Sequence, residues 1–186
     1  MQNVDNIGLK RGYLELFSYN ENYEKIYQEE KRELEKILKG MYIKIEHVGS
    51  TAIKNIVSKP IIDILVVCND LDEFIKFAKE KIQSDTYTIK EEMVREDDFL
   101  IRKEENGKVK VFIHVVPATS KRVKDYILFR DYLNENEEEA KKYEKLKKSL
   151  YEKYKNDRRK YTLGKEDYIS SVIKKAEQYY KNKEYR

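Results

Sequence analysis

The chain has 186 residues, of which 40% are charged, 40% hydrophobic and 12% aromatic. A charged fraction this high is also found in disordered chains, but 16 Tyr and 6 Phe provide bulky apolar surface that such chains lack, so we expect a folded protein. The length predicts one domain, or one domain with an appendage. Cys68 is the single cysteine, which excludes a disulfide framework and a multi-cysteine zinc site and is typical of the reducing cytosol.

No run of apolar residues approaches the ~18 needed for a membrane span, and the N-terminus has no apolar core behind a basic start. We therefore expect a cytoplasmic protein that neither enters a membrane nor is exported. The net charge of +4 is divided into −3 for residues 1–119 and +7 for residues 120–186. Because 30 of the 39 basic residues are Lys, the weaker reader of bases, we expect a solvated helical surface with one local anion site rather than nucleic-acid binding.

The first 119 residues alternate helix and strand patterns. The expected elements, in chain order, are a helix at residues 23–38, strands at 41–48 and 61–67, a helix at 71–82, and strands at 87–89, 99–103 and 108–116. Asn20 is typical of the N-cap of the first helix. The strand at 61–67 is apolar on both faces except for Asp63, which is typical of a central strand. The pair Asn106-Gly107, between the last two strands, is the strongest hairpin signal in the chain.

After the last strand, residues 120–186 have helical patterns only. Two apolar faces at helical spacing occupy residues 123–132 and 140–154, and a third helix is expected to start at Thr162 as its N-cap. Neither an internal repeat nor a Gly/Ser linker separates the two parts. The sequence therefore predicts one compact unit, with an α/β core at residues 1–119 and three helices packed on it.

A turn of small residues and one charged strand residue are the first candidates for function. Gly49 and Ser50 follow a strand, where glycine allows close backbone approach and serine offers a hydroxyl and an amide to a phosphate oxygen. Asp63 lies in an apolar strand, and because an unpaired buried carboxylate is costly, it needs a partner, a metal or a solvent-filled cleft. A structural pairing with Lys59 or His47 is as well supported by these residues as a metal or active-site role.

The block EHVGSTAIKNIVSKPIIDILVV, residues 46–67, resembles the signature of the polymerase-β-like nucleotidyltransferase superfamily: a Gly-Ser turn, then a strand with an Asp-hydrophobic-Asp/Glu triplet. Over residues 7–180 the chain resembles the GrpB (UPF0157) family of that superfamily, through IGLKRG, FLIRK, IHVV, LFRDYLNENEEEAKKYEKLKKSL and YTLGKEDYI. The resemblance implies an α/β (α+β) nucleotidyltransferase-like fold: a mixed, largely antiparallel sheet with flanking helices, and C-terminal helices that close a cleft. It also implies nucleotidyl transfer with Mg²⁺ held by three carboxylates, two from the triplet and one from a later strand.

The chain departs from that pattern at the second carboxylate. Leu65 stands two residues after Asp63, on the same face of the strand, and cannot bind a metal. His114 occupies the best candidate position for the carboxylate of the later strand. One carboxylate and one imidazole suit Zn²⁺ or Mn²⁺ better than Mg²⁺, but Val111 and Phe112 stand where relatives often have further histidines, which argues against a transition-metal site.

Both histidines of the chain, His47 and His114, fall beside the Gly-Ser turn and Asp63, so all three side chains are candidate metal ligands. His114 is also a candidate general base, and with Asp63 it forms the candidate catalytic pair. For His47 the alternative is a hydrogen-bonded position at the end of a strand.

Lys59, Arg130 and Lys165 are candidate contacts for a substrate or phosphate, and the last two match the GrpB pattern. The alternatives are an exposed loop position for Lys59 and ion pairs that fasten helices to the sheet for the other two. Lys165 falls in the first turn of the last expected helix, where the helix dipole disfavours a cation unless both attract the same anion.

Three functions remain open from the sequence. The first is binding of a nucleotide or another phosphorylated small molecule, with nucleotidyl transfer if Asp63 holds Mg²⁺ or Mn²⁺; Zn²⁺ is less favoured. The second is a non-catalytic accessory module with a protein partner, which Leu65 and the fusion of GrpB-like domains to enzymes such as dephospho-CoA kinase favour. The third is metal-dependent hydrolysis of a phosphoester by His47, His114 and Asp63.

Overall fold

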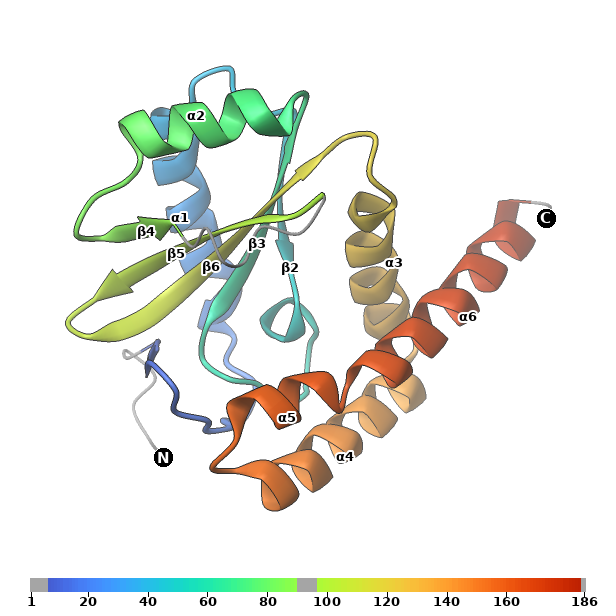
Figure 1. Ribbon diagram of the computed structural model, residues 1–186. Coiled ribbons are helices and arrows are strands. Elements are labelled where there is room, and N and C mark those ends of the chain that lie inside the picture. The colour runs from blue at the N-terminus through green and yellow to red at the C-terminus, as the bar shows by residue number, and fades with distance from the viewer. Residues whose placement is uncertain (1–6, 90–96, 185–186) are drawn as a thin grey trace.

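The computed structural model describes residues 7–89 and 97–184, which form a six-stranded sheet with helices on both faces (Figure 1). The strands, in chain order, are β1 (Leu9–Lys10), β2 (Lys44–Val48), β3 (Ile62–Cys68), β4 (Tyr87–Ile89), β5 (Phe99–Glu105) and β6 (Lys108–Pro117). The order along the sheet is β2-β3-β6-β5-β4, and β1 pairs with the start of β6. Among these strands, β3 and β6 are parallel and the other pairs antiparallel, so the prediction of a mixed, largely antiparallel sheet is confirmed.

Two groups of helices cover the two faces of the sheet (Figure 1). The helices are α1 (Asn22–Leu38), α2 (Leu71–Lys81), α3 (Lys121–Glu135), α4 (Glu137–Tyr154), α5 (Arg158–Leu163) and α6 (Glu166–Glu184), with a 3-10 helix at Ser50–Ala52. The first two pack on one face and α3 on the other, where α4 and α6 pack against α3. None of the helices in the described part of the chain is long and apolar enough to cross a membrane.

The central strands present different side chains to the two helix groups, because successive residues of a strand point to opposite faces. On β3, Ile62 and Ile64 are buried in the core with α1 and α2. Asp63 and Leu65 therefore point to the face that α3 covers. Parallel pairing of β3 and β6 sets His114 beside Leu65. The two candidate residues Asp63 and His114 therefore lie on the same face of the sheet, the one that α3 covers.

Local sequence signals fix several turns and helix ends. Asn106 and Gly107 connect β5 and β6 with φ values of 52° and 72°, as a two-residue hairpin turn requires, which confirms the predicted hairpin. At the start of α1, the side-chain oxygen of Asn20 accepts the amide of Asn22 at 3.0 Å. The N-cap residue is Glu21, so the prediction of Asn20 as the N-cap is wrong by one residue, although Asn20 still satisfies an amide that the helix itself leaves unpaired.

The prediction of three C-terminal helices, the third capped by Thr162, is wrong. In the described residues four helices, α3 to α6, follow the sheet, and Thr162 lies inside α5, where its hydroxyl donates to a backbone carbonyl of the same helix. Asp157 caps α5 instead, by accepting the amide of Lys160 at 3.0 Å. The chain leaves α5 at Gly164, where a Cβ would lie 2.7 Å from a methyl carbon of Leu150, so glycine permits the close approach to α4.

Helices α3 and α4 hold the loop of residues 53–61, which leads into β3. Asn134 of α3 bonds two backbone groups at the start of this stretch, a carbonyl and an amide, each at 2.9 Å. Glu144 of α4 accepts the amide of Val57 at 3.0 Å, and Lys147 donates to the carbonyl of the same residue. The C-terminal helices thus provide the hydrogen-bond partners that the loop lacks within the sheet.

We expect Glu144→Ala to lower the free energy of unfolding by about 1–3 kcal/mol, because the half-buried amide of Val57 loses its acceptor. Glu144→Gln keeps an acceptor oxygen and should cost less than about 0.5 kcal/mol. Urea denaturation measures both, with the exposed Glu138→Ala on the same helix as the control. Equal unfolding midpoints for the Ala and Gln variants would contradict this role of Glu144.

Candidate functional site

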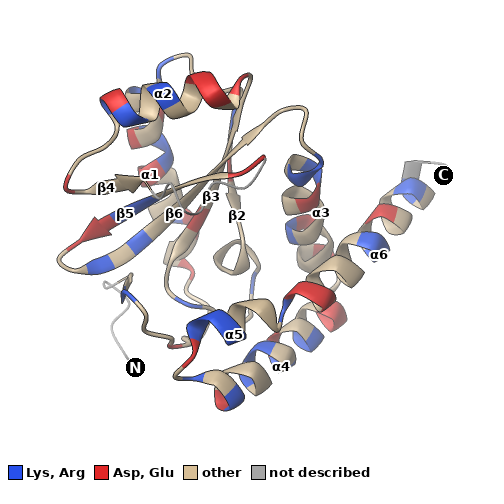
Figure 2. Ribbon diagram, in the orientation of Figure 1, with Lys and Arg blue, Asp and Glu red and all other residues tan. Residues whose placement is uncertain are grey.

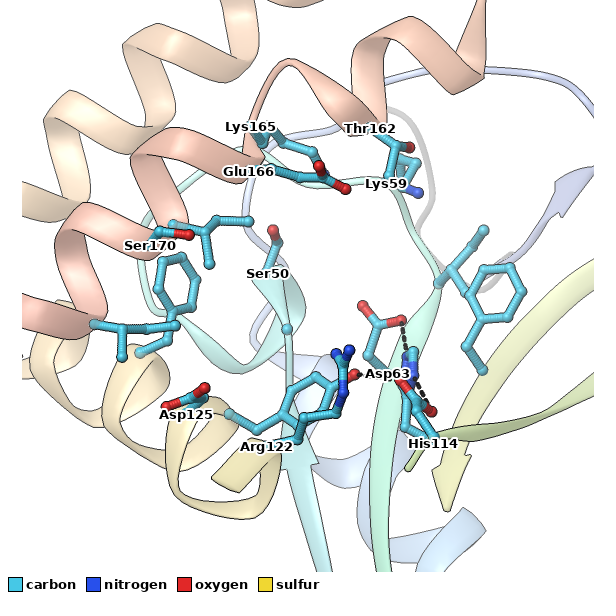
Figure 3. A pocket seen from close by; sticks show the side chains of 18 of the residues that line it. Ser50, Lys59, Asp63, His114, Arg122, Asp125, Thr162, Lys165, Glu166 and Ser170 are labelled. Carbon is cyan, nitrogen blue, oxygen red and sulfur yellow. Dashed lines mark hydrogen bonds and ion pairs between the residues drawn. The ribbon is translucent and has the colours of Figure 1, made fainter. Parts of the chain in front are cut away.

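A cavity of about 880 Å³ lies between the α3 face of the sheet and the helices α3 to α6 (Figure 3). The structure brings six residues that the sequence singled out to its wall: Gly49, Ser50, Lys59, Asp63, His114 and Lys165. Its volume is in the upper part of the ~300–1,000 Å³ range of small-molecule sites. Strand, loop and helix residues far apart in the sequence thus surround one space.

The Gly49-Ser50 turn lies against the carboxylate of Asp63. Gly49 has a φ of 70°, in the left-handed region, and a Cβ at this position would clash with the Asp63 side chain. Ser50 begins the 3-10 helix, and its hydroxyl lies 3.5 Å from the hydroxyl of Tyr143 in α4. Both the backbone conformation and the close approach of Asp63 therefore require glycine at position 49.

Asp63 faces His114 of the neighbouring strand. The Oδ1 atom of Asp63 and the Nε2 atom of His114 are 3.7 Å apart. The other ring nitrogen, Nδ1, lies 3.1 Å from the hydroxyl of Tyr126 and 3.6 Å from Oδ1 of Asp98. The imidazole therefore lies between two carboxylates, and Tyr126 also donates to Asp98 at 3.3 Å.

These contacts shift the pKa values of the pair in opposite directions. Burial lowers the pKa of His114, but the carboxylates of Asp63 and Asp98 outweigh burial and raise it to about 9. Burial raises the pKa of the Asp63 carboxyl, yet His114, Lys59 and Lys165 together bring it below its ordinary value. At neutral pH His114 is therefore positively charged and Asp63 negatively charged.

Three cations line the cavity without a carboxylate partner. In the described residues, no Asp or Glu oxygen lies within 4.0 Å of the charged nitrogens of Lys59, Arg158 or Lys165. Arg158 instead lies over the ring of Phe112, 5.5 Å from its centroid, and Lys165 over the ring of Tyr161 at 4.8 Å. Figure 3 shows Lys59 and Lys165 on the same side of the cavity.

Burial lowers the pKa values of all three cations. Burial, together with repulsion from the nearby Lys165 and Arg158, lowers the pKa of Lys59 to about 7. Burial is also the main cause that lowers the pKa of Lys165 and of Arg158. Figure 2 shows the basic start of α5, which carries Arg158. The nearest counter-charge is Asp63, which raises the pKa of all three cations but lies beyond 4.0 Å from them. Partly buried positive charge without a close counter-ion is unfavourable, so an anion in this cavity would stabilise it.

His47 lies outside this cavity. It pairs with Ile64 across β2 and β3, so its ring points to the α1 face, where it stacks on Tyr27 at 4.8 Å between centroids. Its ring nitrogens lie 3.2 Å from a Glu24 oxygen and 3.0 Å from the hydroxyl of Thr51, and burial lowers its pKa. The structure therefore does not bring His47 together with Asp63 and His114.

Arg130 also lies elsewhere, at the outer edge of β2. It donates to Glu46 at 2.7 Å, to the carbonyl of His47 at 2.9 Å and to Asp131 at 2.7 Å. These bonds fasten α3 to the edge strand, which is the structural alternative that the sequence left open for this residue.

The residues around Asp63 do not fit the carboxylate cage of a two-metal nucleotidyltransferase. Leu65 is fully buried in an apolar cluster with three valines, so the position of the second carboxylate is closed to an ion. Asp98 is separated from Asp63 by the imidazole of His114. In the described part of the chain, no group of three His, Cys, Asp or Glu side chains could hold a metal ion.

Asp98, Tyr126 and Arg158 line the cavity although the sequence analysis did not single them out. Asp98 directly precedes β5, and β5 pairs with β6, the strand that carries His114. The predicted hairpin of these two strands could therefore have indicated a carboxylate near His114. Arg158 belongs to the run DRRK. The sequence analysis noted only the net charge of +7 for residues 120–186, which does not distinguish Arg158 from the other basic residues there. No local pattern distinguishes Tyr126 among the 16 tyrosines of the chain.

We expect the two histidines to titrate on opposite sides of neutrality. By NMR of the imidazole protons in the presence of EDTA, His47 should titrate below its ordinary pKa of 6.5 and His114 near 9. Asp98→Asn removes one carboxylate beside His114 and should lower that pKa while leaving His47 unchanged. Both histidines titrating together near 6.5 would contradict the buried ion pair.

Known proteins resemble this chain over most of its length. The profile of the family "GrpB protein" matches residues 13–175. The glutamate-rich protein GrpB of Alkalihalophilus pseudofirmus is 35% identical over 175 residues, which are 90% of this chain and 98% of that protein. The UPF0157 protein YqkA of Bacillus subtilis is 29% identical over 91% of this chain, which spans 49% of YqkA.

A solved structure agrees with these relatives. The crystal structure of the conserved protein GrpB from Enterococcus faecalis matches this fold with a TM-score of 0.81 at 27% sequence identity. The match covers 89% of this chain and 99% of that chain. The chain therefore belongs to the GrpB family.

Proposed function

We propose that this GrpB-family chain binds a nucleotide or another phosphorylated small molecule in the cavity beside Asp63. The observation that carries the proposal is the group of Lys59, Arg158 and Lys165, which line the cavity and have no carboxylate within 4.0 Å in the described residues. A phosphate would supply the missing negative charge, and charge-assisted hydrogen bonds are about twice as strong as neutral ones.

Two further features support a phosphate at this position. Ser50 lines the cavity and offers a hydroxyl and a backbone amide to a ligand oxygen, while the space beside Gly49 is taken by Asp63. Lys165 immediately precedes α6, so its ammonium group and the N-terminal amides of this helix would attract the same anion.

Binding has more support than nucleotidyl transfer. Transfer by the two-metal mechanism needs carboxylates that hold both ions, and Leu65 stands in the second position within a packed apolar cluster. The same observation favours a non-catalytic module that has kept the fold and its phosphate site. Phosphoester hydrolysis through a metal on His47, His114 and Asp63 has no support from the geometry, because the His47 ring stacks on α1.

Isothermal titration calorimetry with ATP, GTP and inorganic tripolyphosphate tests the proposal. Lys165→Gln should weaken binding at least about tenfold, because it removes a charge that faces the phosphate. Lys174→Gln, an exposed position on the same helix, is the matched control and should bind like the wild type. Because one carboxylate forms no cage, binding should persist when EDTA removes Mg²⁺.

Asp63→Asn separates binding from metal-dependent transfer. Without a metal between them, the Asp63 carboxylate repels a phosphate, so the variant should bind ATP at least as tightly as the wild type. A variant that loses Mg²⁺-dependent binding would instead support nucleotidyl transfer. Failure of the wild type to bind any of the three probes would overturn the proposal.

The affinity for tripolyphosphate should fall as the pH rises through 7, because the pKa of Lys59 is about 7 and a bound anion favours its protonated form. Arg keeps its charge at these pH values, so the affinity of Lys59→Arg relative to the wild type should rise with pH. Calorimetry gives the affinity of Lys59→Arg divided by that of the wild type at each pH. The ionisation of tripolyphosphate changes both affinities equally, so it does not affect this ratio. A ratio independent of pH would contradict a contact between Lys59 and the anion.

A further inference from the structure

The cavity has two ends of different chemistry (Figure 3). The cations and the Ser50 turn account for one end only. The wall between α3 and α6 contains an apolar patch of Phe129, Ile169 and Ile173, with Ser170 beside it. A volume of about 880 Å³ is more than phosphate groups alone fill, so the ligand that fits this cavity has an organic part that reaches the apolar wall.

Asp125 of α3 adds a carboxylate at the apolar end. It lines the cavity, and its side chain is 27% exposed. In the described residues its buried Oδ1 atom has no hydrogen-bond partner and lies 3.9 Å from the Nζ atom of the exposed Lys121, which leaves Oδ2 to face a ligand. Burial raises the pKa of this carboxyl, although Lys121 opposes the shift. Arg122, the cation of α3 that lines the cavity, is already bound to Asp97 at 2.6 Å. This end of the cavity therefore has an acceptor that lacks a donor.

We propose that the apolar end binds a nucleobase with an exocyclic amino group, which lies between α3 and α6 and donates to Asp125. The inference rests on the phosphate-binding function proposed above and specifies the organic part of that ligand. The flat body of a base packs well against aromatic and branched side chains such as Phe129 and Ile173. A nucleotide has its phosphates and its base at opposite ends, and the cavity likewise has its cations at one end and its apolar patch at the other.

Hydrogen-bond chemistry explains the preference for an amino group. A carboxylate accepts only, so it pairs with the N–H of adenine, cytosine or guanine. Inosine and uridine nucleotides have a keto oxygen where adenosine and cytidine nucleotides have the amino group. A base held in the same orientation would then set two acceptors against each other, and its ring N–H would meet Asp125 only after the base had shifted. An asparagine at position 125 would offer both an acceptor and a donor and so accept either kind of base.

Calorimetric titration with ATP, ITP, CTP, UTP, GTP and inorganic tripolyphosphate tests the inference on the wild type and on Asp125→Asn. In the wild type, the nucleotide that binds most tightly should carry an amino group and exceed its deaminated counterpart and tripolyphosphate by about tenfold or more. Asp125→Asn should narrow or reverse this preference. Because the variant also removes a negative charge from the cavity, the preference is compared as the ratio of each nucleotide's affinity to that of tripolyphosphate. Asp72→Asn, exposed on α2, is the matched control and should keep the wild-type preference.

Two results would overturn the inference. If ITP or UTP binds the wild type within about twofold of every amino-bearing nucleotide, the inference fails while phosphate binding stands. If no probe binds, tripolyphosphate included, the proposed function fails with it. An Asp125→Asn variant that keeps the full preference for amino-bearing bases would show that Asp125 is not the acceptor.

Discussion

One carboxylate in the middle of the sheet, that of Asp63, determines how the polar groups around the cavity are arranged. Its charge is balanced by His114 on the neighbouring strand, and Gly49 leaves the room that its oxygens need. Lys59 and Lys165 contribute further positive potential at the same point. An unpaired carboxylate at this depth would cost several kcal/mol, so the sheet and these cations depend on one another.

The site belongs to the sheet and the C-terminal helices together. The loop of residues 53–61 carries Lys59 but has its backbone bonded by Asn134, Glu144 and Lys147 of α3 and α4. The helices also supply Arg158 and Lys165 directly. Because the loop would otherwise leave backbone groups without partners, the helices hold the loop that carries Lys59 in place as well as covering the cavity.

Much of the fold could be predicted because its signals are local. The apolar run of β3 with its single charge, the alternation of β6 around His114 and the Asn106-Gly107 turn each follow from neighbouring residues. The α5 helix could not be predicted in this way, because the cap at Asp157 and the close contact of Gly164 with α4 decide where it begins and ends.

The composition of the site depends on contacts that sequence distance does not reveal. His47 is two residues from Gly49, yet strand alternation sends its ring to the opposite face, away from Asp63. Asp98 and Tyr126 reach His114 only because β5 and α3 lie next to β6 in space. The sequence therefore identified the Gly49-Ser50 turn and the central carboxylate of the cavity but not the groups that orient the imidazole.

The hydrogen bonds of Arg130 and Tyr27 to β2 affect how readily the edge of the sheet can pair with another chain. An edge strand with unoccupied carbonyls is a template on which a strand from another chain can add. On β2, the carbonyl of His47 is bonded by Arg130, and that of Ile45 accepts the hydroxyl of Tyr27 at 2.9 Å. Two carbonyls that an incoming strand would bond are thus occupied by the protein's own side chains, which weakens this edge as a template for intermolecular sheet extension.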